Sequence, residues 1–153
     1  MPPWRRWFAD EGSAPLEFIT AGLLLMVPLV YLIVAISALQ GAAFAAEGAA
    51  RQAARVFVQS PSMAEAERAS ARAALFALDD FGISEDAARL DFDCLPDPRN
   101  CLTRSGTVTV TVRVLIELPL VPSFLGLDAA TSVPFEATAT QTVSRFWGSG
   151  ISS

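Results

Sequence analysis

The sequence has 153 residues, 52% of them hydrophobic, and a formal net charge of −5 at pH 7. No charged residue lies between Glu17 and Glu47, and this distribution excludes both an ordinary soluble globule and a disordered chain. The chain contains no histidine, and all eleven basic residues are arginine. Acid/base catalysis or metal binding by histidine is therefore excluded, and so are Schiff bases and phosphate binding by lysine. The negative net charge argues against a nucleic-acid partner.

A short polar leader, residues 1–12, precedes an apolar run at residues 18–39. A helix of that length spans about 33 Å, which is enough to cross a hydrocarbon core of about 30 Å. The apolar part of a cleaved signal peptide has only about 7–15 residues, so a transmembrane helix fits the run better. Pro28 falls within the run, where a membrane helix tolerates it with a kink.

Helical character continues through residues 40–59, which are rich in alanine and carry Glu47, Arg51 and Arg55 on one stripe. We therefore predict one helix of roughly forty residues, half of it in lipid, that ends before Pro61. Arg51 lies well beyond the lipid boundary. The distribution of arginines on the two sides then favours a cytoplasmic N-terminus, with the rest of the chain outside the cytoplasm.

A second helix is predicted from about Met63 to Asp79. Ser62 and Glu65 have the spacing of a capping box at its start, and Gly82 follows its end. Its expected apolar stripe consists of Ala66, Ala69, Ala73 and Phe76.

From Arg89 onward the hydrophobic pattern alternates, which predicts strands there, over residues 107–118, and from Val133 to Thr142. We infer an α+β fold in which the second helix covers one face of a small three-stranded antiparallel sheet and the other face is solvated. The expected division is a leader at 1–12, a transmembrane helix at 13–46, a helical extension outside the membrane at 47–60, and a head domain at 61–153.

Cys94 and Cys101 flank a proline-rich turn. We expect a disulfide between them, because a membrane-anchored chain with a β domain usually faces an oxidising space. It would contribute ~2.5 kcal/mol in the loop-entropy model. Two free buried thiols are the alternative. A zinc site is not expected, because four ligands are needed and the chain has no histidine.

Asp91 and Asp93 share the exposed face of the first strand, and together with Asp97 they could bind calcium, which prefers several carboxylates. No known pattern of calcium ligands is present, so a solvated strand face is the favoured interpretation. We expect no enzyme, no metal site, no cofactor and no small-molecule substrate.

The segment GSAPLEF, residues 12–18, stands directly before the apolar run. A carboxylate at this position is costly if it enters the lipid, and Glu17 could simply mark the interface. If the chain were cut after Gly12, however, Ser13 would be the new N-terminus and Glu17 would lie on the same face of the helix. The α-amine and the carboxylate could then pair, within one subunit or between neighbours.

This pattern resembles a class III (type IVb) prepilin signal, in which a leader ends in glycine and a Glu-Phe pair, here Glu17 and Phe18, precedes an apolar helix. The whole layout is similar to the TadE-like family of tight-adherence, or Flp-type, pilus pseudopilins. The match rests on GSAPLEF, on FITAGLLLMVPLVYLIVAI and on EGAARQAAR at residues 47–55. The resemblance covers most of residues 12–59. In the rest of the chain, the strand TVTVTVRV is similar in type to the family's strands, but the sequence itself does not match. Pro15 and the acidic residues before the cut depart from the pattern.

The resemblance implies a minor pilin-like structural protein of the cytoplasmic membrane, possessing a head outside the cytoplasm. A prepilin peptidase would cut between Gly12 and Ser13. The mature helix would pack with other pilin or pseudopilin subunits, and its further partners would be the Tad secretion machinery and the lipid bilayer. Glu17 and Phe18 would serve assembly.

Two alternatives remain open. The chain could be a generic single-span, membrane-anchored exported binding domain that is never cleaved. Ala43-Phe44-Ala45 also has the pattern of an ordinary signal-peptidase site, so the N-terminus of the mature chain could instead lie between Ala45 and Gln52.

Overall fold

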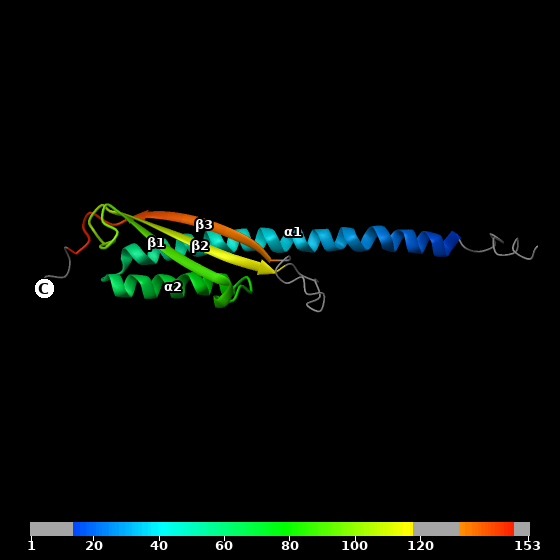
Figure 1. The fold of residues 1–153 in the computed structure, drawn as a ribbon, viewed down its shortest axis with the longest axis horizontal. Coiled ribbons are helices and arrows are strands. Elements are labelled where there is room, and N and C mark those ends of the chain that lie inside the picture. The colour runs from blue at the N-terminus through cyan, green and yellow to red at the C-terminus, as the bar shows by residue number, and fades with distance from the viewer. Residues whose placement is uncertain (1–13, 118–131, 149–153) are drawn as a thin grey trace, which may run out of the picture. The chain divides into compact units, whose positions relative to one another are not determined.

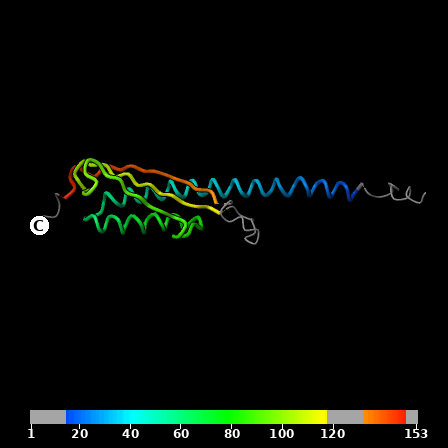
Figure 2. Tube along the Cα trace, viewed as in Figure 1, coloured from blue at the N-terminus to red at the C-terminus, as the bar shows by residue number. Residues whose placement is uncertain are grey.

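The computed structural model describes residues 14–117 and 132–148, and the statements below concern these residues. Their order is helix, helix, a short 3₁₀ turn and three strands, as the colours of Figure 1 show and the chain trace of Figure 2 repeats. The elements are α1 (Ala14–Gln59), α2 (Met63–Asp79), η2 (Glu85–Ala87), β1 (Ala88–Leu95), β2 (Thr107–Glu117) and β3 (Ser132–Thr142). The predicted α+β class, with a long apolar N-terminal helix, is confirmed.

The chain divides into two compact units, one ending at Ile36 and one beginning at Ser37. We call the second the head unit. It contains the C-terminal part of α1 together with α2 and the sheet. The sequence analysis began the head at residue 61 and treated residues 47–60 as a separate extension. That stretch of α1 instead belongs to the head, because its side chains fill the head's core.

The part of α1 inside the head unit presents a buried face made almost entirely of alanine. The members of this alanine face are Ala45, Ala46, Ala49, Ala50, Ala53 and Ala54. Phe57 completes it and is fully buried, its ring centroid lying 5.2 Å from that of Phe92 on β1. The sheet therefore packs against α1 as well as against α2, whereas the sequence analysis assigned its cover to the second helix alone.

Helix α2 begins and ends where the sequence predicts. The backbone N–H of Glu65 donates to the Ser62 hydroxyl at 3.4 Å, and the Ala66 N–H donates to the Ser62 carbonyl at 2.8 Å, so the predicted cap is present. The predicted stripe is wrong in part, because Phe76 is 73% exposed. The buried residues are Ala66, Ser70, Ala74 and Leu78. These four residues are spaced four apart and form one row along α2, whereas Phe76 lies two residues from Ala74 and therefore points to the opposite side of the helix.

The sheet has the order β1-β2-β3, and both pairs are antiparallel. The face predicted for the central strand runs from Val108 through every second residue to Leu118. Val108, Val110, Val112 and Val114 of this face are buried, Ile116 is half-buried, and Leu118 lies outside the described residues. The other face of this strand pairs threonine with threonine across β2 and β3 in three successive rungs, and the hydroxyls of Thr109 and Thr140 lie 3.0 Å apart. The alternating pattern thus sorts the apolar side chains into the core and the hydroxyls onto the outer face.

Two features define the connection from β1 to β2: a disulfide and a close approach of the chain at a glycine. A disulfide joins Cys94 to Cys101, with the Cα atoms 5.1 Å apart, and these are the two cysteines that the sequence analysis paired. Gly106 lies just before β2, where a Cβ atom would be only 2.5 Å from the Thr103 hydroxyl oxygen. The close approach of the chain at this point therefore requires glycine.

Candidate membrane and assembly segment

The N-terminal part of α1 exposes large apolar side chains all around the helix. The exposed residues are Leu16, Phe18, Ile19, Leu23, Leu24, Leu25, Met26, Val27, Leu29, Val30, Leu32, Ile33, Val34 and Ile36. A helix that is hydrophobic on every side is suited to a large core or a lipid bilayer. Within the described part of the chain, α1 is the helix that is long and apolar enough to cross a membrane.

The polar groups of this segment are compatible with a lipid environment. The Thr20 hydroxyl donates to the carbonyl of Leu16 at 2.7 Å, so this side chain is satisfied within its own helix. The helix continues through Pro28, although proline lacks the N–H that would bond to the preceding turn. A membrane-spanning helix must satisfy its backbone hydrogen bonds internally, and the uninterrupted helix over Ala14–Gln59 suits this requirement.

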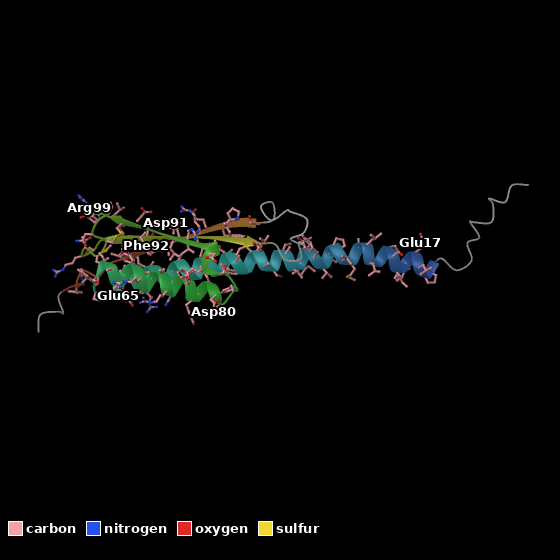
Figure 3. All side chains as sticks on the ribbon, turned by 60° about the horizontal axis from the view of Figure 1, so that its bottom comes forward. Glu17, Glu65, Asp80, Asp91, Phe92 and Arg99 are labelled. Carbon is pink, nitrogen blue, oxygen red and sulfur yellow. A yellow bond between two sulfur atoms is a disulfide. The ribbon has the colours of Figure 1, made fainter. Side chains whose placement is uncertain are left out.

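Glu17 lies in the first turn of α1 and is exposed, as Figure 3 shows at the N-terminal end of the helix. A carboxylate at this position interacts favourably with the positive end of the helix dipole. Among residues 14–117 and 132–148, Glu17 has no hydrogen-bond or ion-pair partner. The adjacent Phe18 is 80% exposed. Both side chains are thus accessible to a second molecule.

The predicted cleavage pair, Gly12 and Ser13, lies outside the described residues, as does the rest of the leader. The first residue of α1 is Ala14, immediately after Ser13. Glu17 is therefore three residues into the helix, in the turn that the predicted cut would leave at the N-terminus.

The three aspartates considered for calcium do not converge. Asp91 forms an ion pair with Arg113, while an Asp97 side-chain oxygen accepts the backbone N–H of Arg99 at 3.0 Å. In Figure 3, Asp91 lies along the sheet and Arg99 at the far end of the head unit. Among the residues that the structure describes, no group of three cysteine or acidic side chains is arranged to hold a metal ion.

An ion network on the outer face of the sheet was not predicted. Arg113 on β2 donates from Nε to Oε2 of Glu136 on β3 at 2.7 Å and from Nη1 to Asp91 on β1, so one guanidinium joins all three strands. The hydrogen bond to Glu136, and then its negative charge, raise the pKa of Arg113. The alternating pattern does place Asp91, Arg113 and Glu136 on one face of the sheet. Whether they come into contact depends on the strand register, which cannot be read from the sequence across long connections.

The chain matches no protein-family model, no curated protein and no solved structure.

Proposed function

We propose that this chain is a minor pilin-like, or pseudopilin, structural component of a tight-adherence, Flp-type pilus assembly system. The observation that supports the proposal is the contrast within α1. Its residues 16–36 expose apolar side chains, whereas residues 45–57 fill the core of a folded head unit. One helix thus carries both a lipid-compatible segment and part of the core of the head, which suits a subunit assembled through its N-terminal helix.

In this proposal a prepilin peptidase removes residues 1–12. The cut exposes the α-amine of Ser13, four residues before Glu17, and these two groups lie on one face of a helix. Pairing neutralises both charges in apolar surroundings, either within a subunit or with the next one. Glu17 and Phe18 then act in assembly, and the partners are other pilin or pseudopilin subunits, the Tad machinery, the peptidase and the bilayer.

The same proposal puts the N-terminus in the cytoplasm and the head outside it. The disulfide between Cys94 and Cys101 supports this orientation, because such bonds persist in oxidising compartments. The proposed role is structural, so the chain needs no cofactor of its own.

The experiment is to determine the N-terminus of the membrane-bound protein by mass spectrometry, in cells with and without a prepilin peptidase. The expected chain begins at Ser13 when the peptidase is present and at Met1 when it is absent. Gly12→Leu, which puts a bulky side chain at the cut, should leave the chain intact, and Gly22→Leu serves as the control because a Cβ there meets no atom within 4 Å.

Two results contradict the proposal. A chain that begins at Met1 despite an active peptidase indicates the uncleaved membrane-anchored domain. A chain that begins between Ala45 and Gln52 indicates ordinary signal peptidase. That cut would remove Ala42 and Ala45, both buried in the structure.

A further inference from the structure

The sheet ends in two edges, and we propose that the β3 edge of one copy pairs with the β1 edge of the next, which continues the sheet between subunits. The order β1-β2-β3 leaves one side of β1 and one side of β3 without a strand partner among the described residues. Such edges present backbone donors and acceptors that a further strand can satisfy. The inference concerns the head unit alone and does not depend on the function proposed above.

The direction of the strands determines which copies can pair. Since β1 and β3 are both antiparallel to β2, they are parallel to each other. A second copy moved sideways along the hydrogen-bonding direction, without being turned over, therefore brings its β1 alongside β3 in parallel. By contrast, antiparallel pairing of β3 with β3 requires one copy to be inverted.

The charges on the outer face favour a second copy as the occupant. Arg89 on β1 and Glu136 on β3 both lie opposite Arg113, so the three residues form one row across the sheet. Arg113 binds Glu136, while Arg89 donates only to the backbone carbonyls of Ala88 at 2.8 Å and Asp86 at 3.5 Å. The sideways movement brings Arg89 of the next copy beside Glu136, which gives this arginine a carboxylate in place of backbone carbonyls and breaks no ion pair among the described residues.

The side chains on the inner face are complementary along the same rows. Leu90 and Ala137 both lie opposite Val112, and Phe92 and Ala139 both lie opposite Val110. Leu90 and Phe92 are large and only half-buried at the β1 edge, whereas the two alanines at the β3 edge have small, buried side chains. Pairing in this register places large side chains next to small ones and covers apolar surface that is now open to solvent.

The β3 edge also has few of the features that usually prevent strand addition. Residues 135–142 carry a single charge, on Glu136, and the only proline of the strand, Pro134, comes before them. Gln141 pairs with Val108 and so belongs to the inner face of the sheet, yet its side chain is exposed. The helices therefore do not cover this end of β3. Long, flat edges that carry few charges are the ones that accept another strand.

Cysteine cross-linking of the full chain in membranes tests the proposal. Asp93 and Thr140 both lie opposite Thr109 on the outer face, so Asp93→Cys and Thr140→Cys are introduced into two separately tagged copies. Within one copy the two positions are separated by β2, roughly 10 Å, which no disulfide spans. Both native cysteines are already bonded to each other, so they offer no competing thiol. Mild oxidation should yield the mixed dimer, and neither variant alone should cross-link.

Two variants examine register and charge. Ser132→Cys replaces Thr140→Cys as the register control, because it lies eight residues, roughly 27 Å, away along β3 and should give no mixed dimer with Asp93→Cys. Arg89→Glu in the Asp93→Cys copy should lower the yield about threefold or more, while Arg89→Lys should retain most of it.

Three outcomes would overturn the inference. Self-cross-linking of Thr140→Cys alone indicates inverted β3–β3 pairing. Equal yields from the Ser132→Cys control indicate random collision. Absence of the mixed dimer, in protein whose native disulfide and circular dichroism are unchanged, shows that the edges do not pair.

Discussion

The indole N–H of Trp147 donates to the backbone carbonyl of Ser60 at 3.1 Å, although the two residues are 87 positions apart. This bond ties the segment after β3 to the turn between α1 and α2. Arg104 donates to the carbonyl of Trp147 at 3.0 Å, so the connection between β1 and β2 joins the same point. Three chain segments that are distant in sequence are thereby fastened together at one end of the head unit.

Removing this bond should weaken the head. Trp147→Phe keeps an aromatic ring but loses the donor, and the carbonyl of the buried Ser60 loses its partner, so the free energy of unfolding should fall by about 1 kcal/mol. Denaturant titration of the detergent-solubilised chain measures it. Phe76→Leu, at an exposed position of α2, should change it by less than about 0.5 kcal/mol. A Trp147→Phe variant as stable as the wild type would show that the bond contributes nothing.

The alanine face of α1 should not tolerate a larger side chain. Ala53→Leu inserts three carbon atoms where the residue is fully buried, and the expected loss is about 1–3 kcal/mol of unfolding free energy. Gln52→Leu introduces the same side chain one position away, on the exposed face, and should be nearly neutral. Thermal unfolding followed by circular dichroism compares the two. Similar losses in both would contradict the packing of α1 against the sheet.

The disulfide should stabilise the head through its short loop. Replacing both Cys94 and Cys101 by alanine should lower the free energy of unfolding by ~2.5 kcal/mol in the loop-entropy model. Addition of a reductant to the wild type should lower stability in the same direction and should leave the double variant unaffected. If the reductant lowered the stability of both proteins equally, the loss in the wild type would not come from breaking the disulfide.

Arg113 should contribute to stability in a salt-dependent manner. Arg113→Met should lower the melting temperature slightly, and the difference from the wild type should narrow as salt is added, because the pairs with Asp91 and Glu136 are exposed. Arg99→Met removes an arginine that has no ion pair among the described residues and should show no such trend. A melting-temperature difference that is independent of salt would argue against the ion network.

The pH dependence of the same variant follows from the raised pKa of Arg113. A group whose pKa is higher in the folded state contributes its full stability below the unfolded pKa and loses it only as pH rises through the folded value. Arginine titrates in strong alkali, so its contribution should be constant between about pH 6 and 9. The melting temperatures of the wild type and of Arg113→Met should therefore differ by the same amount at every pH in that range.

Glu17 should matter for assembly and not for folding. Under the proposed function, Glu17→Ala should be expressed and inserted normally but incorporated poorly into pili, because the N-terminal amine of a neighbouring helix loses its carboxylate. Immunoblots of sheared surface filaments against whole cells give the incorporated fraction. Glu47→Ala removes an exposed carboxylate from the head part of α1 and should assemble normally. Normal filaments with Glu17→Ala would exclude this role.

Much of the local structure was predictable, because single residues and short periods determine it. Ser62 and Glu65 fix the start of α2, and the alternation of valine and threonine fixes β2 almost to its ends. The long apolar run likewise identifies a helix by its length alone. These signals need no knowledge of the rest of the chain.

The tertiary arrangement was less predictable. Alanine contributes little to a hydrophobic pattern, so the burial of Ala49 and Ala53 against the sheet gave no clear signal in the sequence. Phe76 misled for the opposite reason, because a large apolar residue is assigned to the core although it lies on the side of α2 opposite the buried row. The contacts of Arg113 depend on register across connections that pattern analysis cannot measure. Gly12 and Ser13 lie outside the described residues, so their role stays a prediction.

The alanine face has a consequence for how the sequence can change over time. A surface built from single methyl groups accepts few replacements, since glycine costs helix stability and anything larger has no room. Substitutions should therefore accumulate on the opposite side of the same helix, at exposed positions such as Glu47, Arg51 and Arg55. A saturation library of α1 would then divide into tolerant and intolerant positions with the period of a helix, although the wild-type residues on the intolerant side are among the smallest in the chain.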